Sequence, residues 1–128
     1  MNKKTTLVLL SIGLIVFTLS GCNGQPKPLY TYGDYSESYY NSKKYVSKES
    51  ALKLQKSIEY AIENADKSRS KRVAPGMYAN LGYMYLLDGE SAKAIESFNK
   101  EKIIYPESTR FMDRMIHKVE VAQGNNNE

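Results

Sequence analysis

Small and large apolar side chains recur at fixed spacing over residues 75–106, and this pattern constrains the fold more than any other in the chain. Its first four positions, Tyr78, Leu81, Gly82 and Tyr85, follow one another at i, i+3, i+4 and i+7. That spacing places them on one face of a helix. Pro75 suits the start of this helix, where its missing N–H costs nothing. We therefore expect a helix that begins at Pro75 and ends at the turn of residues 88–89.

A second helix is expected after a tight corner at Gly89. Ala94 and Phe98 continue the helical spacing until Pro106 stops it. Gly82 and Ala94 are small enough for two antiparallel helices to approach closely, with Phe98 filling the seam between them. The pattern therefore predicts a helical hairpin.

Residues 75–108 also resemble the 34-residue tetratricopeptide repeat. Counted from Pro75, seven positions match it: Tyr78, Leu81, Gly82, Tyr85, Ala94, Phe98 and Pro106. Glu101 departs from the repeat, which has a small residue there. Its carboxylate either reaches solvent, since no full repeat follows, or is buried and paired, and we favour a structural acid over a catalytic one. Lys102 cannot be its partner, because adjacent helix residues do not face each other.

The remaining segments predict further helices. Tyr32, Tyr35 and Tyr39 indicate a helix from about Asp34, and Ser47 can cap another that runs from about residue 48 to residue 66. A closing helix from about residue 108 has an apolar side made of Phe111, Met115, Ile116, Val119 and Ala122. Shifting the repeat by 34 residues instead keeps Met112, Met115, Ile116 and Val119 apolar. We expect an all-α fold of TPR-like antiparallel helical hairpins, about five helices in all.

The amino-terminal segment has the pattern of an export signal. Lys3 and Lys4 precede a thirteen-residue apolar run over 7–19, which is too short to cross a bilayer as an ordinary helix. Ser20, Gly21 and Cys22 then resemble the lipobox of bacterial lipoproteins. The resemblance implies that cleavage follows residue 21 and that Cys22 becomes the lipid-modified first residue. The alternatives are a plain secretory signal and a retained anchor.

This reading divides the chain into four parts. We expect a signal peptide over 1–21, a flexible tether over 22–29, a TPR-like domain over 30–122 and a disordered tail over 123–128. By resemblance to lipoproteins generally, Asn23 points to sorting outward, hence to the outer membrane facing the periplasm. Without Lys3 and Lys4 the net charge falls from +4 to +2, which gives little reason to propose nucleic acid as a partner.

A second resemblance covers about residues 22–118. It is carried by Pro28-Leu29-Tyr30-Thr31-Tyr32-Gly33-Asp34-Tyr35, by the run from Val73 to Tyr83, by Phe98-Asn99-Lys100-Glu101-Lys102, by Tyr105-Pro106-Glu107-Ser108 and by Phe111-Met112. These segments resemble a group of small bacterial lipoproteins defined as a domain of unknown function, in which Glu101 belongs to the recurring pattern. Such proteins are typically encoded with a lipoprotein resembling the curli secretion channel. The resemblance implies an envelope assembly and supplies no activity.

The tyrosine-rich segment and the basic segment each have two possible roles, and few residues offer metal-binding or catalytic chemistry. Six of the eleven tyrosines fall within residues 30–45, as core packing or as a binding surface. Residues 67–72 carry four positive charges, as a solvated loop or as a site for anionic lipid or an acidic partner. His117 is the sole histidine and Cys22 the sole cysteine, so we expect no metal site, no cofactor, no small-molecule substrate and no enzyme activity.

We therefore expect a lipid-anchored interaction module for other envelope proteins. In the packing that the repeat implies, Ala79, Asn80, Tyr83 and Leu86 line a groove. Asn80 stands where peptide-gripping repeats bond the peptide backbone, whereas Ala79 stands where they usually have lysine. The groove side chains could instead only cover a neighbouring helix. The alternative function is a carrier of lipid or another hydrophobic ligand in the periplasm.

Overall fold

A computed structural model describes residue 2 and residues 26–124, and within these it is all-helical. It contains five α-helices and two short 3-10 turns: α2 (Tyr35–Lys44), α3 (Lys48–Glu63), η1 (Ala65–Lys67), α4 (Met77–Leu87), α5 (Ser91–Ile104), η2 (Pro106–Ser108) and α6 (Thr109–Gly124). This confirms the predicted all-α fold of about five helices. Apart from residue 2, the predicted signal peptide lies outside the described residues, as do Cys22 and residues 125–128 of the predicted tail.

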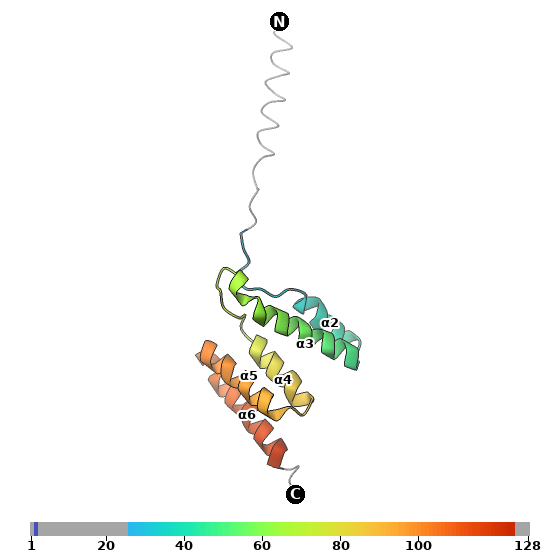
Figure 1. Cartoon of the computed structure of the whole chain (residues 1–128), viewed down its shortest axis with the longest axis vertical. Helices are drawn as coiled ribbons and strands as arrows, with labels where there is room; N and C mark the ends of the chain where they lie inside the picture. Colours follow the sequence, from blue (N-terminus) through green and yellow to red (C-terminus); the bar gives the residue numbers. More distant parts are fainter. Residues whose placement is uncertain (1, 3–25, 125–128) are drawn as a thin grey trace.

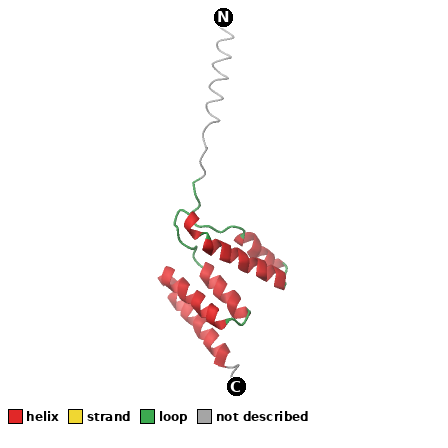
Figure 2. Ribbon diagram, viewed as in Figure 1, coloured by secondary structure: helices red, strands yellow, loops and turns green. Residues whose placement is uncertain are grey.

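Consecutive helices pack against each other as antiparallel pairs. Figures 1 and 2 show α2 beside α3, α4 beside α5, and α6 beside α5, stacked in a row. The chain enters at one end of this row, next to the turn that follows α3, and α6 leads to the other end. The arrangement is that of TPR-like hairpins with a closing helix. Within the described part of the chain, no helix is both long and apolar enough to cross a membrane.

The close approach of α4 and α5 depends on Gly82. A Cβ atom added there would lie 2.6 Å from Cε1 of Phe98 and 3.1 Å from the carbonyl oxygen of Ala94. Phe98 is 1% exposed and Ala94 is fully buried. Any side chain larger than that of glycine would therefore force the buried Phe98 ring to move or the two helices to separate.

Two apolar clusters form the core, one on each side of α4. The cluster shared by α3, α4 and the segment between them comprises Leu54, Ile58, Ala61, Ala65, Val73, Ala74, Met77 and Leu81. The cluster of α5 and α6 comprises Ala94, Phe98, Met112 and Val119. Tyr85 packs against both. Helix α4 thus joins the two halves of the molecule.

The closing helix α6 faces α5 with Met112 and not, as the predicted apolar side would have it, with Phe111. Met112 is 1% exposed and Val119 is fully buried, whereas Phe111 is 53% exposed and Ala122 lies at the surface. Neighbouring helix residues point about 100° apart, so Phe111 and Met112 cannot both face α5. The register of the shifted repeat was correct, and it turns the Phe111 ring out to solvent.

The observed starts of α4 and α3 can be compared with the predicted ones. Helix α4 begins at Met77 and not at Pro75, because Gly76 has a φ of +84°, outside the right-handed helical region. Helix α3 begins where predicted, and Ser47 caps it. The Ser47 hydroxyl accepts the Ser50 N–H, and the Ser50 hydroxyl accepts the Ser47 N–H.

Candidate docking surface

The structure gives Glu101 a specific structural position. Its carboxylate is 3% exposed and accepts the backbone N–H of Gly76 at 2.7 Å and that of Ala79 at 3.3 Å. Helix α4 has no capping side chain of its own. A negative charge from α5 therefore caps the positive end of α4, which stabilises both the unpaired N–H groups and the helix dipole. This use of Glu101 is architectural.

A second buried contact holds the segment before α4 against the end of α5. The Tyr105 hydroxyl donates to the carbonyl of Val73 at 2.6 Å, and Arg72 donates to the carbonyl of Ile104 at 2.6 Å while lying over the Tyr105 ring. Burial raises the pKa of Tyr105 to about 12, with the nearby Tyr30 hydroxyl adding to the effect and Arg72 opposing it. Tyr105 is therefore a neutral donor that fixes this linker.

Three of the four predicted groove residues lie at the rim of hollows beside α4. Ala79, Asn80 and Tyr83 line them, whereas Leu86 is half-buried and packs against the cluster of α5 and α6. The Asn80 amide donates to the Tyr35 hydroxyl on α2 at 3.0 Å, so part of its hydrogen-bonding capacity is used inside the molecule. Tyr83 is 46% exposed.

One hollow, of about 260 Å³, lies between α4 and the first hairpin. Its lining is aromatic and aliphatic with a polar edge: Tyr35, Tyr39, Ser42 and Lys43 from α2, Ala51, Leu54 and Ile58 from α3, and Asn80, Tyr83, Met84 and Leu87 from α4. Here the tyrosine stripe forms a row of rings. The centroids of Tyr32 and Tyr35 are 6.4 Å apart and those of Tyr35 and Tyr39 are 5.9 Å apart.

The other hollow, of about 300 Å³, lies on the opposite side of Tyr83. It is lined by Ala79, Asn80 and Tyr83 from α4, Phe98 from α5, and Phe111, Met115 and Lys118 from α6. The exposed ring of Phe111 stands at this site because Met112 occupies the buried position. Asn80 and Tyr83 belong to both hollows.

We name the surface that runs across α2, α4 and α6 the Tyr83 face. It consists of Tyr39, Lys43, Asn80, Tyr83, Leu87, Phe111, Met115 and Lys118. Four of its side chains are large, apolar or aromatic, and 43% to 64% exposed: Tyr39, Tyr83, Leu87 and Phe111. Neither hollow is lined by a carboxylate, and each contains one lysine. The sequence pattern predicted Asn80 and Tyr83 for a groove and left the tyrosines of residues 30–45 open as a binding surface, but it gave α6 no part in either.

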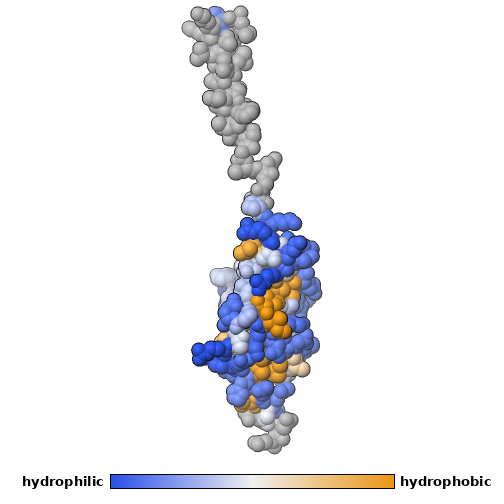
Figure 3. All heavy atoms as spheres, turned by 90° about the vertical axis from the view of Figure 1, so that its left-hand side faces the viewer, coloured by the Kyte–Doolittle hydropathy of each residue, from blue (hydrophilic) through white to orange (hydrophobic). Residues whose placement is uncertain are grey.

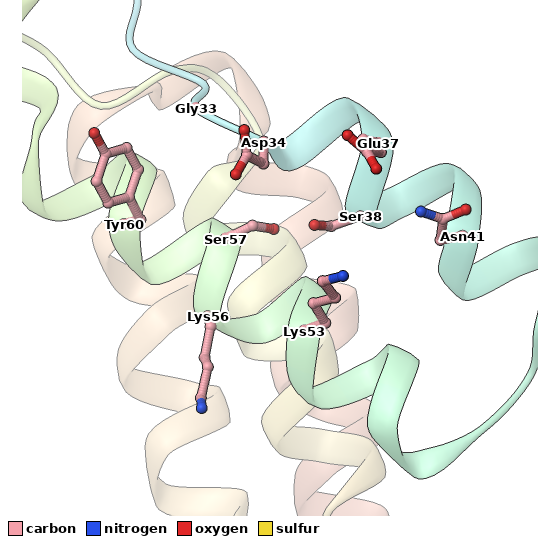
Figure 4. A pocket seen from close by; sticks show the side chains of 9 residues that line it. All are labelled: Gly33, Asp34, Glu37, Ser38, Asn41, Lys53, Lys56, Ser57 and Tyr60. Carbon is pink, nitrogen blue, oxygen red and sulfur yellow. The ribbon is translucent and has the colours of Figure 1, made fainter.

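A third hollow, of about 510 Å³, lies between α2 and α3 away from α4 and has a different character (Figure 4). Figure 4 shows Ser38 and Ser57 pointing toward each other between the two helices, with Asp34, Glu37 and Lys53 around them. The two serines are buried, at 5% and 8% exposure, and the rest of the lining is solvated and of mixed charge. Among the described residues, no group of three or more His, Cys, Asp or Glu side chains could hold a metal ion.

His117 is exposed on α6, with its Nδ1 3.9 Å from a carboxylate oxygen of Glu120. It lies in neither hollow of the Tyr83 face. The geometry therefore gives it no part in the candidate surface.

The fold and this surface define a small TPR-like helical protein with an exposed aromatic face. Residues 29–115 match the family described as "Domain of unknown function (DUF4810)", and the chain belongs to that family. The matched segment includes both hairpins and the first part of α6, and therefore almost all of the Tyr83 face. No curated protein and no solved structure is similar enough to the chain to count as a match.

Proposed function

We propose that this protein is a lipid-anchored envelope lipoprotein that acts as a non-enzymatic interaction module in a membrane-associated assembly, and that it binds its partner through the Tyr83 face. The observation that carries the proposal is the half-exposed ring of Tyr83 between two hollows, with further exposed rings on α2 and α6. An aromatic side chain between two recesses is the arrangement of an interface hot spot, because it offers large contact area at low entropic cost.

The chemistry of the surface favours a protein segment as its occupant. Tyrosine, phenylalanine and methionine are enriched at protein interfaces. Two recesses on either side of one ring suit two anchoring side chains of a bound helix, as in helix-in-groove recognition. Lys43 and Lys118 stand in separate hollows, and no carboxylate lines either one. A segment with apolar anchors and acidic flanks would therefore fit.

The membrane part of the proposal rests on the sequence. Lipidation of Cys22 would attach the chain by two or three acyl chains, enough for stable anchoring. Confinement to a surface raises the effective concentration of a partner held in the same membrane. The outer membrane, facing the periplasm, is the proposed location. A lipoprotein resembling the curli secretion channel is the first partner to test.

Metabolic labelling tests the anchor independently of the surface. Radiolabelled palmitate should enter the wild-type chain, and Cys22→Ser should abolish the label. Labelling that survives this substitution would contradict lipidation of Cys22. It would not bear on the Tyr83 face.

A pull-down from crosslinked envelopes tests the surface. Tyr83→Ala should reduce recovery of a specific partner at least tenfold, a hot-spot loss of more than about 1.4 kcal/mol. Tyr60→Ala is the matched control, because Tyr60 is 50% exposed but lies on α3 at the polar hollow. Asn80→Ala should be compared with Tyr35→Phe, since both remove the internal hydrogen bond and only the first alters Asn80. Equal recovery with Tyr83→Ala and Tyr60→Ala would remove the groove proposal.

A carrier function is the weaker proposal. Sites that carry small ligands usually hold 300–1,000 Å³ and cover most of the ligand surface. The two apolar hollows hold about 260 and 300 Å³ and lie at the surface. Lipid that copurifies with the chain beyond its own anchor would reverse this ranking.

A further inference from the structure

The loop after α3 presents a cluster of positive charge with a defined shape. Lys67, Arg69, Lys71 and Arg72 are all exposed, while Ser68 between them is buried at 3% exposure. The Ser68 hydroxyl donates to the carbonyl of Ala65 at 2.6 Å and accepts the N–H of Lys71 at 3.1 Å. The charges are therefore held on a structured turn.

The same loop is paired with the segment that leads back to the proposed anchor. The N–H of Arg69 donates to the carbonyl of Pro28 at 2.9 Å, and the N–H of Ser70 donates to that of Leu29 at 3.1 Å. Lys27 is exposed beside this contact, and Leu29 is 49% exposed. Figure 1 shows the entering chain and the loop at the same end of the bundle. In Figure 3, strongly hydrophilic side chains gather where the chain enters the body.

Covalent geometry limits the distance from this loop to the membrane. Pro28 is six positions after Cys22, and a fully extended chain spans about 3.4 Å per residue, so Pro28, which accepts a hydrogen bond from the loop, lies within about 20 Å of the anchored residue. The bound holds for any conformation of the residues between them. A lipidated chain would therefore keep its basic loop within reach of the headgroups.

The available charges are mostly unneutralised. Arg72 is engaged with the carbonyl of Ile104, and Lys67 with the amide oxygen of Asn64. Within the described residues, no carboxylate forms an ion pair with Lys27, Arg69 or Lys71. The acids nearest in sequence are Glu63, at the end of α3, and Asp66, in the turn η1, and the basic residues outnumber them.

We propose that Lys27, Lys67, Arg69 and Lys71 bind anionic phospholipid headgroups and so orient the bundle on the membrane that holds its anchor. The inference rests on the lipid anchor of the proposed function, not on the Tyr83 face. The end of the bundle that contains the loop then faces the bilayer, and the end of α6 points away from it. The membrane is preferred to an acidic protein as the ligand, because the short tether keeps the membrane within reach.

Fluorescence energy transfer from the protein to labelled lipid tests the orientation. The mature lipidated chain would be reconstituted in phosphatidylcholine vesicles with or without phosphatidylglycerol, with a headgroup-labelled acceptor lipid. Lipidation would consume the thiol of Cys22, so Asp66→Cys beside the loop, or Asp88→Cys between α4 and α5, would be the site of donor labelling. Arg69→Gln/Lys71→Gln removes two charges from the loop, and Lys53→Gln/Lys56→Gln removes two from the flank of α3.

The proposal expects phosphatidylglycerol to raise energy transfer from position 66 more than from position 88. Each basic residue near an anionic surface contributes about fivefold to the docking equilibrium constant, so the loop variant should reduce that constant roughly 25-fold at low salt, and high salt should also lower it. The α3 variant should leave the transfer unchanged. Equal transfer from position 66 with and without phosphatidylglycerol would overturn the proposal and leave an acidic protein as the partner of the loop. Loss of vesicle attachment with Cys22→Ser, but not with the loop variant, separates the anchor from the docking.

Discussion

The two hairpins of this molecule are held together by different chemistry. The seam between α4 and α5 is dry, with Gly82, Ala94 and Phe98 all buried. Helix α2 buries one residue, Ser38, against α3, and a polar hollow lies along that seam. The second hairpin is therefore the scaffold, and α2 is the lightly held element.

The difference matters because α2 forms one wall of the Tyr83 face. It is joined to α4 through the hydrogen bond from Asn80 to Tyr35 and through packing of the Tyr35 ring. Elements with little buried apolar area open at lower free energy than the global fold. One wall of the surface can thus adjust to a partner while α4 and α6 stay fixed on the scaffold.

The largest effect is expected in the dry seam. Phe98→Ala should lower the free energy of unfolding by about 3–5 kcal/mol, because it removes a buried ring and leaves a cavity. Phe111→Ala is the matched control, since the same ring is half-exposed on α6, and it should cost less than about 1 kcal/mol. Urea unfolding followed by circular dichroism measures both. Comparable losses would contradict the division into scaffold and surface.

Loss of the buried carboxylate should have the next largest effect. Glu101→Ala removes two hydrogen bonds to a charged acceptor and leaves two N–H groups at the start of α4 without it, so we expect a loss of about 2–3 kcal/mol. Glu96→Ala, which removes an exposed partner of Lys100 from the same helix, should leave the free energy of unfolding nearly unchanged. Matching values for the two variants would show that Glu101 does not cap α4.

The linker contact predicts a dependence on alkaline pH. Burial raises the pKa of Tyr105 from about 10 in the unfolded chain to about 12 in the fold, so the folded state holds its proton in that window. The stabilisation is complete below about pH 10 and is lost as the pH rises toward 12. The wild type should lose about 1–3 kcal/mol more than Tyr105→Phe over this range. Parallel pH profiles of unfolding for the two proteins would refute this assignment.

The smallest effect is expected in the first hairpin. Tyr35→Phe removes the hydrogen bond to Asn80 and should cost about 0.5–1.5 kcal/mol globally. Its clearer signature is faster amide hydrogen exchange in α2, with protection in α5 unchanged. Equally slow exchange in wild-type α2 and α5 would contradict the conclusion that α2 is held more weakly than the second hairpin.

The sequence predicted the elements that depend on local spacing. The stripe of Tyr78, Leu81, Gly82 and Tyr85 located α4, and Gly82 with Ala94 anticipated the close approach to α5. The spacing of Tyr32, Tyr35 and Tyr39 also located α2, although Tyr32 itself precedes that helix. These features follow from residues within a few turns of one another.

Features that need two distant segments could not be derived in this way. The partners of Glu101 are backbone groups 25 and 22 residues earlier in the chain, which no spacing on α5 reveals. The choice between Phe111 and Met112 depends on how α6 is rotated against α5. Likewise, Leu86 and Leu87 are adjacent in sequence, and only the packed structure shows that Leu87 lines the hollow while Leu86 packs inward.

Site-specific photo-crosslinking in intact envelopes tests the central claim most directly. A photoreactive amino acid would replace Tyr83 on the Tyr83 face or, as the control of similar exposure, Tyr60 at the polar hollow. The account predicts one discrete crosslinked protein from position 83 and none from position 60. The same products from both positions, or a discrete product from position 60 alone, would contradict it.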